Sequence, residues 1–183
     1  MNATVIDVHT HVVPKHFPKN PAPDHEHRWP CMHCASNEKE ATVMIADKPF
    51  RQVDHRSWDV SRRLDDMDSS RVARQALSPM PELLSYWFDP ATGMEMCQWM
   101  NDTIANMVAV APNRFSGLGT VPLQDPSMAA KYMQRLKSEG FAGIEVGSNI
   151  NGALLGEEQF DEAFAAAEEL DMAIFVHALH PIG

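Results

Sequence analysis

The segment VIDVHTHVVP (residues 5–14) is largely apolar, and Asp7, His9 and His11 occupy alternate positions in it. Side chains along a β-strand point to alternate faces, so these polar groups are expected on one side of a first strand. Two imidazoles placed in this way can share one metal ion, with bonds of about 2.0 Å. In a chain with nine histidines a His-x-His pair can also arise by chance, so this segment leaves both interpretations open.

Further apolar runs follow along the chain and alternate with segments of helical periodicity. They are VARQALSPMP (72–81), FSGLGTVPL (115–123), FAGIEVGS (141–148) and MAIFVHAL (172–179). Continuous apolar runs that end in polar or turn residues are typical of parallel strands buried on both faces. Stripes of Met, Phe and Ala at helical spacing between these runs indicate helices that pack into a core.

The predicted helices have recognisable starts and stops. Asp89-Pro90 and Asp125-Pro126 each place a capping acid before a proline at the first helical position, and Gly140 predicts a helix end. Strands that alternate with helices predict an α/β fold with a parallel sheet, either an open doubly wound sheet or a (β/α)8 barrel of the TIM type. No Gly-rich phosphate loop follows the first strand, which argues against a dinucleotide-binding fold.

The region from about residue 14 to 58 interrupts this alternation and is interpreted as an insertion. Its first part is rich in Pro, His and charge, and ATVMIADKPFRQV (41–53) predicts a hairpin that turns at Asp47-Lys48. In a barrel, an insertion after the first strand lies over the C-terminal mouth, where active sites are built.

The composition narrows the class of protein. A formal net charge of -10 argues against a nucleic-acid partner, because phosphate backbones are bound through clustered Lys and Arg. No apolar run reaches the about 18 residues that a membrane span needs, and the N-terminus lacks a signal-peptide pattern. The three cysteines, Cys31, Cys34 and Cys97, are too few for a disulfide framework. We therefore expect a cytoplasmic protein without a membrane partner.

His177 stands at the end of the strongly apolar run AIFVH (173–177), where a solvated histidine is not expected. A hydrogen-bonded core histidine is the ordinary explanation for a lone case. In a parallel barrel, however, the C-terminal ends of all strands face one mouth, so His177 would converge with His9 and His11. Three nitrogen ligands with an open fourth position are typical of a catalytic zinc site, in which bound water reaches a pKa of about 7.

The chain resembles the amidohydrolase superfamily, and within it the branch of metal-dependent decarboxylases around 2-amino-3-carboxymuconate 6-semialdehyde decarboxylase. The resemblance covers nearly the whole chain and is carried, in order, by DVHTHVVP, KPFRQVDHRSWD, RLDDMD, LLSYWF, GLGTVPLQDP and IFVH. It implies a (β/α)8 barrel of which residues 1–183 form the N-terminal part, with five βα units and the insertion at about 14–58.

The resemblance also implies roles for individual residues. His9 and His11 match the first-strand zinc ligands, His177 matches the fifth-strand ligand, and Arg51 matches an arginine that holds a substrate carboxylate. A bidentate Arg–carboxylate contact suits an acidic substrate. Asp7 could hydrogen-bond a ligand ring and so orient it. The implied cofactor is Zn²⁺, with another divalent metal as an alternative, and the implied assembly of the full-length protein is a homodimer.

The chain departs from the family pattern in two ways. Close members follow the fifth-strand histidine with Pro-Trp-Asp, whereas this chain has Ala178-Leu179-His180-Pro181, so the pocket wall differs and His180 could line it. A barrel of this type needs about 250 residues or more. We therefore expect the proton-transfer histidine of the sixth strand and the final aspartate ligand beyond Gly183, and expect this chain alone to be inactive.

Cys31 and Cys34, with His25, His27 and His33 nearby, form a second candidate cluster. A structural zinc site takes four ligands in paired motifs, and only one Cys pair is present. A thioredoxin-like pair would open a helix after a strand, which this Pro-flanked loop does not supply. A second metal or redox site is therefore not favoured.

The sequence thus predicts a zinc-dependent, non-oxidative decarboxylase of a small unsaturated or aromatic carboxylic acid. The first alternative is a metal-dependent hydrolase or hydratase of the same superfamily, because one barrel supports many reactions. The second alternative is a non-catalytic partial barrel that acts as a binding or assembly subunit, because a partial barrel leaves two sheet edges open.

Overall fold

The structure is a computed structural model that describes residues 4–23, 27–36 and 39–179. Its strands and α-helices, in chain order, are β1 (Val5–Val12), β2 (Cys31–Cys34), β3 (Glu40–Ile45), β4 (Lys48–Asp54), α1 (Val60–Ser69), β5 (Val72–Pro79), α2 (Pro90–Val110), β6 (Phe115–Gly119), α3 (Pro126–Ser138), β7 (Gly143–Gly147), β8 (Asn149–Ile150), β9 (Ala153–Leu154), α4 (Asp161–Glu169) and β10 (Ala173–His177). Three short 3-10 helices lie at His55–Ser57, Pro81–Leu84 and Glu158–Phe160. None of the described helices is both long and apolar enough to cross a membrane.

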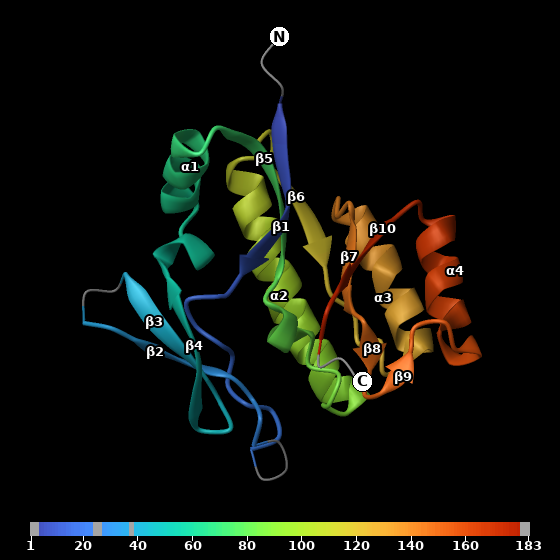
Figure 1. The fold of residues 1–183 in the computed structure, drawn as a ribbon. Coiled ribbons are helices and arrows are strands. Elements are labelled where there is room, and N and C mark those ends of the chain that lie inside the picture. Colours follow the sequence, from blue (N-terminus) through green and yellow to red (C-terminus); the bar gives the residue numbers. More distant parts are fainter. Residues whose placement is uncertain (1–3, 24–26, 37–38, 180–183) are drawn as a thin grey trace.

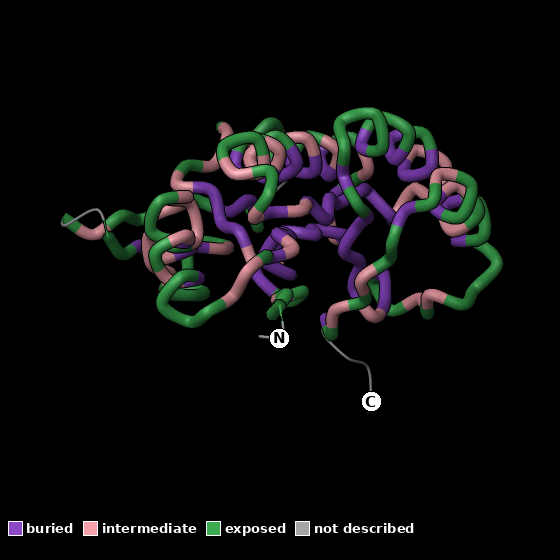
Figure 2. The backbone as a smooth tube through the Cα atoms, turned by 90° about the horizontal axis from the view of Figure 1, so that it is seen from above, coloured by how far each residue is buried: buried purple, intermediate pink, exposed green. Residues whose placement is uncertain are grey.

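The main sheet has five strands in the order β1-β5-β6-β7-β10, and every neighbouring pair is parallel. The sheet is strongly curved, and the helices lie along its convex side, as Figure 2 shows from above. A curved parallel sheet whose successive strands are joined by helices is part of a (β/α)8 barrel rather than an open doubly wound sheet. The predicted fold class is therefore confirmed, and β1 and β10 form the two edges.

The helices begin where the sequence predicts. Asp89 caps α2 by accepting hydrogen bonds from the main-chain nitrogens of Ala91 and Thr92, and Asp125 caps α3 through that of Met128. Each capping acid is followed by proline at the first helical position. Gly140 adopts a φ of +87° just beyond α3, a conformation that few other residues tolerate. These caps explain why the boundaries could be read from the sequence.

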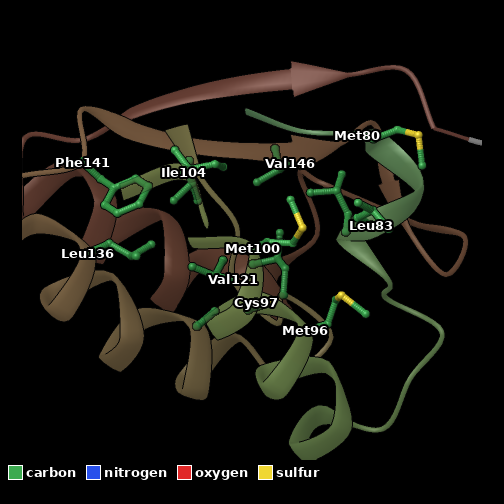
Figure 3. Close-up of a cluster of buried hydrophobic side chains, with 14 of the residues drawn as sticks. Met80, Leu83, Met96, Cys97, Met100, Ile104, Val121, Leu136, Phe141 and Val146 are labelled. Carbon is green, nitrogen blue, oxygen red and sulfur yellow. The ribbon is translucent and has the colours of Figure 1, made fainter. Parts of the chain in front are cut away.

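The core lies between the convex face of the sheet and the helices. Figure 3 shows Met96, Met100 and Ile104 of α2 among buried residues of the strands and loops around them. All three side chains are fully buried, as is Met133 of α3. The methionine stripes are therefore core residues, and their unbranched side chains fill the irregular space between helix and sheet.

The insertion forms a separate antiparallel sheet in the order β2-β3-β4. In Figure 1 this sheet lies beside the lower end of β1, where the chain leaves the strand. The hairpin between β3 and β4 turns at Ala46 and Asp47, which have φ values of 51° and 56°. The turn is one residue earlier than predicted, because Lys48 pairs with Ile45 and so belongs to the second strand.

Candidate metal centre

Three imidazoles from the two edge strands of the main sheet meet on its concave side. His9 and His11 lie on β1, and His177 ends β10. The ring centroids are 5.0 Å apart for His9–His11, 4.9 Å for His9–His177 and 5.1 Å for His11–His177. One nitrogen from each ring lies within 4.8 Å of those of the other two. Residues far apart in the sequence thus converge because the sheet curls.

Hydrogen bonds fix which nitrogen two of these rings present. Nδ1 of His11 lies 3.0 Å from the carbonyl oxygen of Pro79, and Nδ1 of His177 lies 2.7 Å from that of Ala178. Because a carbonyl oxygen only accepts, each Nδ1 carries the proton and each Nε2 keeps its lone pair. A neutral imidazole with a free Nε2 is a good donor to a divalent cation, so the residues fit a metal site.

The electrostatic surroundings keep His11 neutral. Burial, together with the neighbouring His177 and His9, lowers the pKa of His11 to about 4, and the hydrogen bond to Pro79 opposes the shift. The charge of Arg51 acts in the same lowering direction. At neutral pH the His11 ring is therefore unprotonated, the form that metal ions bind.

A buried arginine holds β1 in place behind the histidines. The guanidinium of Arg63 on α1 donates to the main-chain oxygen of His11 at 2.7 Å, to that of Arg56 at 2.9 Å and to the side chain of Gln75 at 3.3 Å. Burial lowers the pKa of Arg63 to about 10, so the group remains charged at neutral pH. Sequence reasoning overlooked this residue, although RLDDMD was among the segments that carried the resemblance.

The structure places Asp7 beside the backbone of the site. Its carboxylate accepts a hydrogen bond of 3.1 Å from the main-chain nitrogen of His9. The pairing of β1 with β5 is irregular between Asp7 and Thr10, and this contact lies in that irregular stretch. A hydrogen bond from a metal-ligand ring to Asp7 remains a prediction.

Glu145 in the middle of β7 is a second residue that sequence reasoning overlooked. Its side chain is fully buried, and Oε2 lies 4.0 Å from Nδ1 of His11. Burial raises the pKa of Glu145 to about 7, and the nearby Ser78 hydroxyl opposes the shift. The sequence did contain a signal for Glu145. The run FAGIEVGS is predicted to be a buried strand, and an acidic residue is unusual within such a strand.

A cavity of about 570 Å³ connects the histidine cluster with the inserted sheet. His11 and Met80 line it on the barrel side, and Arg51 and Cys34 line it on the side of the inserted sheet. A site of this volume suits a small molecule. The structure thus places Arg51 in the same cavity as one of the candidate metal ligands.

Neither cysteine of the insertion belongs to the histidine cluster. Cys31 and Cys34 are free, exposed residues at the two ends of β2, and their spacing directs them to opposite faces of the strand. Within the described ranges, the histidine triad forms the only group of three or more potential metal ligands. His25 and His180, which the sequence also suggested, lie outside the described residues.

Comparison with known proteins assigns the family. A sequence model of the amidohydrolase family matches residues 6–182, and the chain therefore belongs to this family. It is 34% identical over 181 residues to the 2-amino-3-carboxymuconate-6-semialdehyde decarboxylase of Dictyostelium discoideum, covering 97% of this chain and 50% of that protein. The resemblance seen in the sequence is confirmed.

Solved structures agree with this assignment. The structure of 5-carboxyvanillate decarboxylase from Novosphingobium aromaticivorans with manganese and 4-hydroxy-3-methoxy-5-nitrobenzoic acid has a TM-score of 0.62 and 33% identity, over 65% of this chain and 34% of that chain. The IDCase of Metarhizium anisopliae has a TM-score of 0.75 at 20% identity, over 97% of this chain and 51% of that one, which supports the fold alone. The chain spans about half the length of these curated decarboxylases of Dictyostelium discoideum and Caenorhabditis elegans.

Proposed function

We propose that the chain carries the metal-binding part of a divalent-metal-dependent, non-oxidative decarboxylase of a small aromatic or unsaturated carboxylic acid. The observation that supports this most directly is the convergence of the three histidine nitrogens within 4.8 Å of one another. Curated relatives of the chain include a 2-amino-3-carboxymuconate-6-semialdehyde decarboxylase of Dictyostelium discoideum and a gamma-resorcylate decarboxylase of Polaromonas.

In this proposal one group of residues binds the cation and another residue binds the substrate. His9, His11 and His177 would hold the cation, and two of them are already oriented with Nε2 free. Arg51 would bind the substrate carboxylate through its forked guanidinium, from the other side of the shared cavity. When bound, the metal would stabilise the negative charge that develops as carbon dioxide leaves.

The chemistry requires one bond to break and one to form. The bond between the substrate carbon and its carboxyl carbon breaks, carbon dioxide leaves, and a proton joins the carbon that remains. We assign the proton transfer to a histidine, as the family resemblance implies. We propose zinc as the cation, since three imidazoles with an open position suit it, although structural relatives carry manganese. A cytoplasmic homodimer likewise remains a proposal.

The test uses the gene product that contains this chain, loaded separately with Zn²⁺ and Mn²⁺. A panel of conjugated and aromatic acids, including gamma-resorcylate and 5-carboxyvanillate, is assayed for carbon dioxide release. The proposal predicts release from at least one acid, dependent on the metal. Hydrolysis or water addition without carbon dioxide release would favour the alternative hydrolase or hydratase and would contradict the proposal.

A substitution tests the role of Arg51. Loss of the charged hydrogen bonds in Arg51→Gln should raise KM by about 10- to 100-fold, since such bonds contribute roughly 1.5–3 kcal/mol. Arg62→Gln is the matched control, because Arg62 is an exposed residue of α1 whose guanidinium is paired with Asp65. An unchanged KM in Arg51→Gln would remove Arg51 from the substrate site.

A further inference from the structure

Glu145 is the feature of the site that the proposed function leaves unexplained. It occupies the middle of β7, in which all five residues are buried, and it pairs in register with Phe175 of β10. Among the described residues it is the only buried carboxylate. Neither of its oxygens has a hydrogen-bond partner within the described part of the chain.

An acid in this position is costly for the fold. A buried carboxylate without a partner loses its hydration and gains nothing in return. An ordinary structural acid in a core would have donors around it. The orphaned oxygens therefore indicate that Glu145 acts toward a group that completes the site.

The geometry shows where Glu145 acts. Nδ1 of His11 lies 3.0 Å from the oxygen of Pro79, 3.5 Å from Oγ of Ser78 and 4.0 Å from Oε2 of Glu145. Oxygen atoms thus gather at the Nδ1 side of the ring, and Nε2 is the nitrogen left for a cation. Glu145 itself does not belong to the cluster of three potential ligand nitrogens.

The charges around the histidines are consistent with this role. The three described imidazoles are neutral donors, and the buried side chain that holds β1, Arg63, is positive. A carboxylate behind a ligand imidazole makes the ring a stronger donor and offsets the cation's charge. Glu145 is the described buried group that can do this.

We propose that Glu145 is a positioning residue of the metal centre, which supports His11 as an Nε2 donor and offsets the charge of the bound cation. This inference rests on the proposed function, because it assumes that the three histidines bind metal. It adds a residue that touches neither the substrate nor, in this geometry, the ligand nitrogens.

The experiment measures the affinity of the metal-free gene product that contains this chain for Zn²⁺ alone, by competition with a chromophoric chelator. Glu145→Gln keeps the size and removes the charge, and should weaken binding by about 10- to 100-fold, as the loss of such supporting groups typically does. Glu145→Asp should recover part of the affinity because it restores the charge. Glu169→Gln, the same change at an exposed position of α4, should leave the affinity unchanged.

A second readout separates this role from a merely structural one. Because the acid is buried without a partner, the metal-free Glu145→Gln chain should melt at the same temperature as the parent or higher. Affinity within twofold of the parent in Glu145→Gln, together with a large loss in His177→Ala, would overturn the role of Glu145 alone. An unchanged affinity in His177→Ala would instead overturn the metal centre itself, and the role of Glu145 with it.

Discussion

Replacing Arg63 with methionine should destabilise the chain and weaken the metal centre together. The guanidinium is 6% exposed and makes three hydrogen bonds, one of them to the main chain of His11. Hydrogen bonds from a charged donor contribute roughly 1.5–3 kcal/mol each, or about 5–9 kcal/mol in all. Methionine avoids the several kcal/mol that it costs to desolvate the buried guanidinium, and this gain offsets part of the loss. The free energy of unfolding should therefore fall by about 2–4 kcal/mol.

Urea unfolding followed by circular dichroism measures this loss. With a slope of about 2 kcal/mol/M, the midpoint should fall by roughly 1–2 M. Arg62→Met is the matched control, because Arg62 lies on the same helix but forms only an exposed ion pair with Asp65. Loss of this ion pair should lower the free energy of unfolding by less than about 0.5 kcal/mol. The reasoning is refuted if Arg63→Met remains within about 0.5 kcal/mol of the parent.

Three further outcomes follow from the packing and the caps. Asp89→Ala should lower the free energy of unfolding in urea by about 1 kcal/mol, and Asp89→Asn should lower it less. Hydrogen bonds at the start of the helix depress the pKa of Asp89, so the stabilisation from its charge should be present above about pH 4 and lost as the pH falls further. Equal losses of stability in Asp89→Ala at pH 3 and pH 7 would contradict this. Gly143→Ala should prevent docking of β10, because the new Cβ would overlap the carbonyl oxygen of Ala173. Gly156→Ala meets no atom within 4 Å and should change the melting temperature little. A thiol reagent should label Cys31 and Cys34 in the native chain, because both are exposed. Cys97 should be labelled only on unfolding, because it is buried and burial raises the pKa of its thiol to about 12. Labelling of all three cysteines at one rate would contradict the buried position of Cys97.

Much of the fold could be predicted because the helix caps and the apolar runs in the sequence indicate the same alternation of strands and helices. The capping acids before Pro90 and Pro126 marked helix starts, and the apolar runs between the helices had the lengths of buried strands. Parallel strands then place their C-terminal ends on one side, which is why His177 could be connected with the histidines of the first strand. The register of the hairpin was misjudged by one residue, because both Ala46 and Asp47 adopt positive φ and alanine carries no turn signal.

The parts of the site that escaped prediction depend on tertiary contacts. Arg63 reads as one of several charged residues on an amphipathic helix, and only the packing of α1 against β1 and β5 shows that its guanidinium is buried. Glu145 could have been singled out as an acid within a buried strand, but its target could not. Nδ1 of His11, which lies 4.0 Å from Glu145, comes from a strand more than one hundred positions earlier, and no local pattern connects the two residues.

The central claim, that three imidazoles bind one cation, is tested most directly by a crystal of the chain grown with Mn²⁺. Anomalous difference density should show a single strong peak within bonding reach of the imidazole nitrogens of His9, His11 and His177. A peak elsewhere, such as between Cys31 and Cys34, would contradict the claim. So would a well-ordered map in which no manganese is bound and the ring of His177 points away from the other two.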